Sequence, residues 1–316
     1  MTMTPASNEN RTAVVLMAYG TPRTKDEILP YYTDIRRGRP PTPELLEELT
    51  ARYDAIGGLS PLKQLTEAQR DALQRELDAI EPGQYHVTLG LKHATPFIEE
   101  AVAEVAAAGF RRIVGLVLAP HYSSYSIGQY IGRVREAAAP HGIEVKGIDS
   151  WATEPAFVDF LAADMRAKLA SMPENTKVLF TAHSLPQRII DGGDPYPTEL
   201  RATAEAVAAK AGLTRWSQWS IAWQSAGRTP EPWIGPDILE VISSFGAQRT
   251  TDEPIDGVLV SACGFVADHL EVLYDLDIEA AQHAARAGIA FARTASMNAD
   301  PTVLGSLAER IIGLSA

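Results

Sequence analysis

The stretch KVLFTAHSLP, residues 177–186, decides the fold of this chain. Its hydrophobic run contains the β-branched and aromatic residues typical of a strand, and it ends at His183, where Ser184, Leu185 and Pro186 break the strand. Ligands of open parallel sheets bind beyond the carboxyl ends of the strands. The stretch therefore predicts that His183 belongs to a functional site at such an end.

The same pattern recurs along the chain. The run TAVVLMA, residues 12–18, is continuously hydrophobic rather than alternating, as a parallel strand covered on both faces requires. Further strand-like runs alternate with helical stretches, and this alternation predicts parallel sheets with right-handed crossovers. We expect these strands over 85–91, 112–119, 144–148, 177–182, 216–223, 258–262 and 289–293.

The length of the chain favours two α/β units. It has 316 residues, of which 46% are hydrophobic, and more strand-like runs than one modest sheet needs. We expect an N-terminal lobe over 1–150 and a C-terminal lobe over 151–299, each a parallel sheet flanked by helices. The terminal helix over 300–316 is free in this scheme to pack back on the first lobe. Two facing lobes predict a cleft between them.

Composition and missing motifs argue against several functions. The net charge of −12 argues against a general nucleic-acid surface, because phosphate binding needs a basic field. The single cysteine, Cys263, can supply neither an internal disulfide nor the four thiolates of an iron–sulfur cluster. We find no signal peptide and no apolar run near the roughly 18 residues of a membrane span, so we expect a cytoplasmic protein without integral membrane contact. GxGxxG, P-loop, GxSxG, CxxC and HExxH motifs are absent, which weakens nucleotide, flavin and serine-hydrolase functions.

A row of carboxylates begins in GFVADHLEVLYD, residues 264–275. Asp268 would cap a helix with Glu271 three residues later, an acidic version of the capping box. Glu271, Asp275 and Glu279 also recur every four residues and so share one side of the predicted helix. Like charges at this spacing cost about 0.2–0.5 kcal/mol per exposed pair. A solvated face tolerates that cost and a path for divalent cations or protons would use the row, so spacing alone leaves both interpretations open.

The candidate ligand-binding residues are a histidine, arginines and aromatic residues. His183 alone would often be structural, but beside a carboxylate it forms an N/O site suited to borderline divalent metals such as Fe²⁺. Arg36, Arg37 and Arg39, with Arg52 nearby, lie in or near the loops beside the first strand's end, where guanidinium groups suit carboxylate binding. A flat aromatic ligand with several carboxylates would use these arginines together with aromatic residues of the candidate loops: Tyr19, Tyr53, Tyr122, Tyr125, Tyr130, Trp223 and Trp233.

At this point the sequence resembles a known family. Nine segments resemble the motifs of ferrochelatases, in order, from about residue 13 to residue 275: MAYGTP, YYTDIRRGR, RYDAIGGLSPL, GLKHATPF, LAPHYSSYS, TAHSLP, GDPYP, WQSAGRTPEPWIGPD and GFVADHLEVLYD. Their number and order make the resemblance specific. It implies two Rossmann-like lobes with a porphyrin in the cleft, in agreement with the pattern of strands and helices.

The resemblance also implies roles for single residues. His183 of TAHSLP and Glu271 of DHLE match the family's catalytic metal-site pair, and Asp275 and Glu279 match an acidic ridge suggested to deliver metal. The tyrosine of MAYG is similar to that of the coproporphyrin III branch. The positions that match porphyrin contacts are Tyr19, Arg36, Arg52, Tyr53, Ser60 and Tyr130.

The function that this resemblance implies is insertion of Fe²⁺ into coproporphyrin III, a lyase reaction of haem biosynthesis. Fe²⁺ is then a substrate, no organic cofactor is needed and no iron–sulfur cluster is expected. His183 is the candidate acceptor of pyrrole protons, and Glu271 would hold metal or orient the imidazole. The implied ligands are coproporphyrin III and Fe²⁺, and the implied oligomeric state is a monomer.

Three alternatives stay open. The nearest is a protoporphyrin IX ferrochelatase, or a cobalt or nickel chelatase of another tetrapyrrole. The second is a non-catalytic two-lobed protein that binds haem, porphyrin or a siderophore. The third is an α/β protein whose histidine and carboxylates are structural. The sequence decides neither the face of the porphyrin that iron enters nor the selectivity against other divalent metals.

Overall fold

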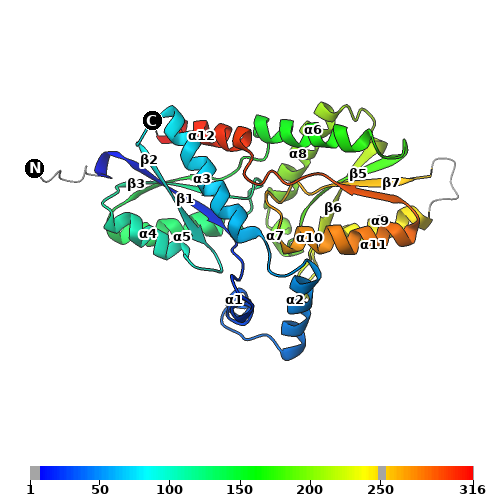
Figure 1. The fold of residues 1–316 in the computed structure, drawn as a ribbon, viewed down its shortest axis with the longest axis horizontal. Helices are drawn as coiled ribbons and strands as arrows, with labels where there is room; N and C mark the ends of the chain where they lie inside the picture. Colours follow the sequence, from blue (N-terminus) through cyan, green and yellow to red (C-terminus); the bar gives the residue numbers. More distant parts are fainter. Residues whose placement is uncertain (1–7, 248–253, 316) are drawn as a thin grey trace, which may run out of the picture.

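The fold contains two parallel sheets, described for residues 8–247 and 254–315 in a computed structural model (Figure 1). In this part of the chain, the N-terminal sheet has the strand order β2 (Tyr85–Leu91), β1 (Thr12–Ala18), β3 (Arg112–Val117) and β4 (Glu144–Ile148). The C-terminal sheet has the order β6 (Trp219–Gln224), β5 (Thr176–His183), β7 (Gly257–Ser261) and β8 (Ala290–Arg293). All neighbouring strands pair in parallel, so the predicted class of two parallel α/β lobes is confirmed.

Helices connect the strands and cover both faces of the sheets (Figure 1). The N-terminal half carries α1 (Ile28–Ile35), α2 (Pro43–Ala55), α3 (Leu62–Ile80), α4 (Ile98–Ala107) and α5 (Ile127–Ala138). The C-terminal half carries α6 (Pro155–Leu169), α7 (Gln187–Asp191), α8 (Tyr196–Ala211), α9 (Ile238–Ala247), α10 (Leu270–Leu273), α11 (Ala281–Ala287) and α12 (Pro301–Ser315). Short 3₁₀ turns lie at Asn8–Asn10, Lys25–Glu27, Ala139–His141 and Trp216–Gln218.

Strand β1 shows why its sequence is continuously hydrophobic. Each of its seven residues is buried. Val14 and Leu16 pack in a core with α3 and α12, whereas Ala13, Val15 and Met17 pack in a second core with α4 and α5. Successive side chains of a strand point to opposite faces, so a sheet covered on both faces needs apolar residues at every position.

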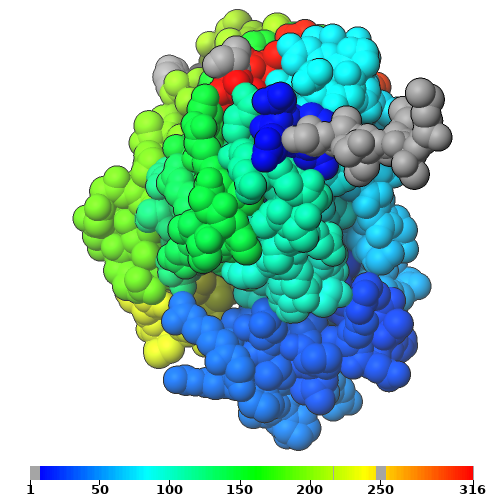
Figure 2. All heavy atoms as spheres, turned by 90° about the vertical axis from the view of Figure 1, so that its left-hand side faces the viewer, coloured from blue at the N-terminus to red at the C-terminus, as the bar shows by residue number. Residues whose placement is uncertain are grey.

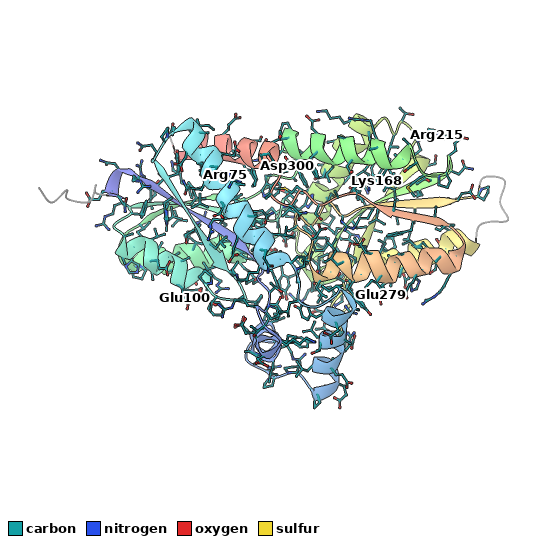
Figure 3. The ribbon with its side chains drawn as sticks, in the orientation of Figure 1. Arg75, Glu100, Lys168, Arg215, Glu279 and Asp300 are labelled. Carbon is teal, nitrogen blue, oxygen red and sulfur yellow. The ribbon has the colours of Figure 1, made fainter. Side chains whose placement is uncertain are left out.

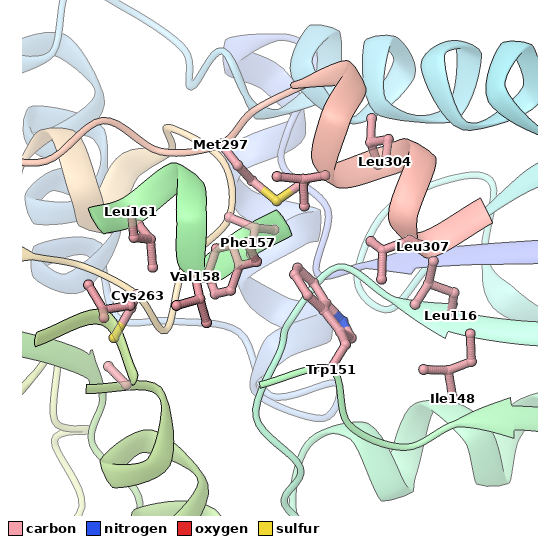
Figure 4. Packing of buried hydrophobic residues seen from close by; sticks show 14 of the residues in the cluster. Leu116, Ile148, Trp151, Phe157, Val158, Leu161, Cys263, Met297, Leu304 and Leu307 are labelled. Atoms are coloured by element: carbon pink, nitrogen blue, oxygen red, sulfur yellow. The ribbon is translucent and has the colours of Figure 1, made fainter. Parts of the chain in front are cut away.

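The two lobes share one hydrophobic core around Trp151, which follows β4 (Figure 4). The Trp151 indole Nε1 donates to the carbonyl oxygen of Val117 at 3.0 Å, and its ring lies 5.1 Å from that of Phe157 in an edge-on arrangement. Met297 and Leu304 belong to the same core, because α12 packs on both α3 and α6. The division at 1–150 and 151–299 stays a prediction.

The helix after β7 differs from the prediction in two ways. Asp268 does not cap it: its carboxylate accepts hydrogen bonds from Ser296 and Asn298, each at 3.0 Å, and His269 occupies the N-cap position. The helix is also not a continuous α-helix, because Asp275–Ala280 form a π turn in which the Glu279 N–H donates to the Tyr274 carbonyl. The prediction of one regular α-helix is therefore wrong beyond Asp275, and π turns of this kind often accompany functional sites.

Candidate active site

Strand β1 leads into the segment of α1 and α2, and these two helices lie together on one side of the two sheets (Figure 1). The two sheet orders correspond strand for strand, so β1 and β5 hold equivalent places as the first strand of each lobe. The surface is hollowed between the α1–α2 segment and the N-terminal lobe, with atoms of the C-terminal lobe behind (Figure 2). Both first strands thus end at one cleft, where parallel α/β sheets bind ligands.

His183 is the last residue of β5, and its imidazole is fixed from behind. Nδ1 donates to the carbonyl oxygen of Ser184 at 2.5 Å, which leaves the lone pair of the neutral ring on Nε2. Nε2 lies 3.9 Å from Oε1 of Glu271, and 35% and 36% of the two side chains are exposed. The structure therefore brings together, within reach of solvent, the two residues that the sequence assigned to one centre.

Glu271 faces a second imidazole that sequence reasoning missed. Nδ1 of His269 donates to the carbonyl oxygen of Ala267 at 3.0 Å, and its Nε2 lies 3.8 Å from Oε2 of Glu271. Burial alone would raise the pKa of Glu271, but His183, His269 and Arg52 lower it to about 2. Glu271 is therefore a carboxylate at neutral pH and attracts cations. The position of His269 two residues before Glu271 was the signal that could have identified it.

Asp275 is the most buried member of the carboxylate row. The Ser225 hydroxyl donates to its Oδ2 at 2.5 Å, and its Oδ1 lies 3.4 Å from Nη1 of Arg52. Burial, followed by the charge of Glu271, raises the pKa of Asp275 to about 6, while Ser225 and Arg52 act in the opposite direction. Glu279 lies on the lower side of the helix (Figure 3), and its charge also raises this pKa. The row thus holds carboxyl groups with very different proton affinities.

Arg52 of α2 connects the N-terminal segment to the C-terminal lobe. Besides Asp275, its guanidinium lies 3.8 Å from the carboxylate of Glu48 and 4.8 Å over the ring of Tyr274. Glu48 in turn pairs with Arg228 of the C-terminal lobe. We expect Arg52 to bind a carboxylate of the ligand. Such a carboxylate would either bind the guanidinium together with Asp275 or replace Asp275 as its partner.

The three other expected contacts around α1, α2 and α3 differ in accessibility. Arg36 follows α1 and is partly exposed, with its guanidinium 5.7 Å from the ring of Tyr32. Tyr53 is almost fully buried, and burial raises its pKa to about 12. Ser60 is buried as well, and its hydroxyl accepts from the Leu62 backbone at 3.2 Å, at the start of α3. Of the three, Arg36 is the most accessible to a bound carboxylate.

Tyr19 and Tyr130 belong to the N-terminal side of the cleft. Tyr19 follows β1 and is 43% exposed, whereas Tyr130 of α5 is buried beneath the ammonium group of Lys92, 5.1 Å from its ring. Burial, followed by the charges of Glu271 and Asp34, raises the pKa of Tyr19, and the exposure of the residue reduces the size of this effect. The carboxylate of Glu271, from the C-terminal lobe, is thus among the groups that act on Tyr19.

Three further findings bear on metals and membranes. The described residues contain no group of three histidine, cysteine or acidic side chains arranged to hold a metal ion. Cys263 lies in the shared core (Figure 4), where burial raises the pKa of its thiol to about 12. None of the helices in 8–247 and 254–315 is both long and apolar enough to cross a bilayer.

Comparison with known proteins gives consistent results. The ferrochelatase family model matches residues 11–313. The coproporphyrin III ferrochelatase of Geobacillus kaustophilus is 43% identical over 305 residues, which cover 95% of this chain and 94% of the relative. The ferrochelatase of Herpetosiphon aurantiacus is 43% identical over 309 residues, which cover 96% of this chain and 99% of the relative. Among solved structures, SirB from Bacillus subtilis with Fe³⁺ has a TM-score of 0.55 at 13% identity, with 97% of this chain and 96% of that chain covered. The latter similarity concerns the fold.

Proposed function

Because the chain belongs to the ferrochelatase family, we propose that it inserts Fe²⁺ into coproporphyrin III and so forms iron-coproporphyrin in haem biosynthesis. The names of its most similar relatives support coproporphyrin III as the porphyrin. The observation that carries the chemistry is the open Nε2 of His183, 3.9 Å from the carboxylate of Glu271, where the first strands of both lobes end.

The reaction replaces two pyrrole protons with one Fe²⁺ ion. A pyrrole N–H bond breaks, its electron pair stays on nitrogen and binds the metal, and the proton passes to a base. His183 is suited to this task, since its Nδ1 proton is held by Ser184 while Nε2 is open. The Glu271 carboxylate, kept ionised by its surroundings, would stabilise the imidazolium that forms and attract the incoming cation.

The carboxylates beyond Glu271 give the substrate metal a route to the cleft. Asp275 and Glu279 follow Glu271 along the same helix, and their charges act on one another. A row of carboxylates raises the local concentration of divalent cations. We propose that Fe²⁺ passes along Glu279 and Asp275 toward Glu271 and His183.

The porphyrin would lie between the walls of the cleft. Coproporphyrin III carries four propionates, which suit guanidinium and hydroxyl groups at the edges of the site. The flat ring suits the aromatic walls. The residues that we propose for these contacts are Tyr19, Arg36, Arg52, Tyr53, Ser60 and Tyr130. We also propose that the protein acts as a cytoplasmic monomer with neither an organic cofactor nor an iron–sulfur cluster, in keeping with its single cysteine.

The test is anaerobic Fe²⁺ insertion followed by the loss of porphyrin fluorescence, with coproporphyrin III and protoporphyrin IX side by side. We expect turnover of coproporphyrin III by the wild type. His183→Ala should lower kcat by about 100-fold or more, the usual contribution of a general base, without loss of porphyrin binding. Glu271→Gln should give a similar loss, because it keeps the shape of the side chain and removes the charge.

Three results would change the proposal. Equal or better turnover of protoporphyrin IX would identify the protein as a protoporphyrin ferrochelatase. Porphyrin binding without insertion by the wild type would indicate a binding protein. Undiminished turnover by His183→Ala would exclude this histidine as the base.

A further inference from the structure

The side of the cleft that Tyr19 belongs to carries an imidazole that the proposed mechanism does not use. His93 follows β2, the neighbour of β1, and its backbone N–H donates to the Tyr19 carbonyl oxygen at 3.0 Å. This bond continues the pairing of the two strands beyond their ends. It fixes the two side chains side by side, with ring centroids 4.5 Å apart and planes at 57°.

A carboxylate orients the imidazole of His93. Oδ2 of Asp34, on α1, lies 2.7 Å from Nδ1 of His93. Since a carboxylate accepts hydrogen bonds, Nδ1 carries the proton of the neutral ring and Nε2 carries the lone pair. Within the described residues, no hydrogen bond to this Nε2 is formed. The carboxylate of Asp34 thus orients the imidazole of His93 as the aspartate of a catalytic triad orients its histidine, with Nε2 left to act as a base.

The surroundings of His93 favour the neutral ring. Burial lowers its pKa most, the hydrogen bond to Asp34 opposes burial with a smaller effect, and the charges of Lys92 and Arg133 lower the pKa further. The side chain is 14% exposed. His93 is therefore available at neutral pH to accept a proton, as a general base must be.

The stoichiometry of metal insertion asks for such a group. Each Fe²⁺ ion displaces two pyrrole protons, whereas the single open nitrogen of His183 holds one at a time. His183 ends β5 of the C-terminal lobe, whereas Tyr19 and His93 follow β1 and β2 at the corresponding place of the N-terminal lobe. A planar ring bound between these two places presents one face to each.

We propose that His93, oriented by Asp34, accepts the pyrrole proton that leaves toward the Tyr19 side, while His183 accepts the other. This inference rests on the proposed function. In the step, a pyrrole N–H bond breaks, the electron pair remains on the pyrrole nitrogen to bind Fe²⁺, and the proton forms a bond with Nε2 of His93. Solvent at the mouth of the cleft then removes the proton. Asp34 is a positioning residue, since it acts through His93.

The experiment uses the full chain with coproporphyrin III and Fe²⁺ under anaerobic conditions. The variants are His93→Ala, His93→Gln and Asp34→Asn, and His141→Ala is the control because His141 is exposed beyond α5. We expect His93→Ala to lower kcat by about 100-fold, within the range of general-base catalysis, with unchanged KM values for porphyrin and Fe²⁺. Added imidazole should restore part of the rate, and the solvent deuterium isotope effect on kcat should increase. Asp34→Asn should lower kcat by about tenfold, because it keeps a partner for Nδ1 and removes the charge.

Each other outcome overturns the inference. A kcat of His93→Ala and His93→Gln within twofold of the His141→Ala control would show that His93 takes no proton. A raised KM for Fe²⁺ with unchanged kcat would indicate that His93 binds the metal. Loss of porphyrin binding would indicate that His93 contacts the porphyrin and takes no proton. Failure of the wild type to insert iron would instead refute the proposed function, so the two failures are distinguishable.

Discussion

Asp275→Asn should make the protein more stable at neutral pH, although it removes a charged partner of Arg52. The pKa of Asp275 is raised from 3.8 to about 6, chiefly by burial, so the folded state disfavours the charged form. Only 10% of the side chain is exposed, and solvent therefore screens little of this cost. Asparagine carries no charge and keeps a partner for the Ser225 hydroxyl.

The size and the pH dependence of the effect follow from the two pKa values. A rise from 3.8 to about 6 is worth about 3 kcal/mol at 1.36 kcal/mol per pH unit. The full difference is present above pH 6, because the carboxyl is then ionised in both the folded and the unfolded state. It shrinks as the pH falls from 6 toward 3.8, since the folded state takes up the proton first, and it vanishes below 3.8. The ionisation of Glu271 affects stability in the opposite direction, because its pKa is lowered from 4.5 to about 2. Its contribution stabilises the folded state fully above pH 4.5 and is lost as the pH falls through 2.

Unfolding by urea, measured for wild type and Asp275→Asn between pH 4.5 and 8, tests the reasoning within the window that Asp275 dominates. We expect the variant to be more stable by about 1–3 kcal/mol above pH 6, and the difference to decline toward pH 4.5. Glu279→Gln is the control, with a change within about 0.5 kcal/mol expected for a partly exposed residue. A variant that is less stable than wild type at neutral pH would refute the argument, because the ion pair with Arg52 would then outweigh the cost of burial.

Two further substitutions probe the shared core at Trp151 and the packing of Trp233 near His183. Trp151→Phe removes the indole donor to a buried carbonyl of β3 and should lower the free energy of unfolding by about 1–3 kcal/mol, measured by urea denaturation. Gly227→Ala places a Cβ 2.3 Å from the ring of Trp233, which lies 6.4 Å from the imidazole of His183. The ring must move, and we expect kcat for metal insertion to fall by about tenfold or more. Gly235→Ala, whose Cβ would have its nearest neighbour at 3.7 Å, should leave kcat unchanged.

The buried strands were predictable because both faces of each sheet are covered. The runs predicted over 85–91 and 144–148 agree with β2 and β4 to the residue, although both contain polar residues, because the turn residues Gly83 and Gly142 precede them. The strand predicted from residue 216 begins at Trp219, because a 3₁₀ turn occupies the three residues before it. The tryptophan of that turn, Trp216, is a residue type common in strands, and only backbone geometry separates the turn from a strand.

The site was predictable where it depends on strand ends and not where it depends on distant partners. Local sequence was enough to place His183 at the end of an apolar strand, whereas the contact of Arg52 with Asp275 joins residues 223 positions apart in the chain. His93 also follows a strand, but its partner Asp34 comes from a helix 59 residues earlier, and no local pattern joins them. The π turn after Asp275 changes the helical repeat without a distinctive residue, so nothing in the sequence indicated it.

The correspondence between the lobes explains why the chemistry lies on both sides of one cleft. Tyr19 follows β1 and His183 ends β5, so the two stand at equivalent places. Each lobe also supplies an imidazole whose Nδ1 is hydrogen-bonded: His93 in the N-terminal lobe and His183, beside His269, in the C-terminal lobe. The acidic partners differ, because Glu271 faces the open Nε2 of His183 whereas Asp34 holds the Nδ1 of His93. An acid at Nε2 favours a cation beside the imidazole, and an acid at Nδ1 favours a proton on the free nitrogen. Under the two proposals, the C-terminal side of the site therefore handles metal and proton, and the N-terminal side handles a proton alone.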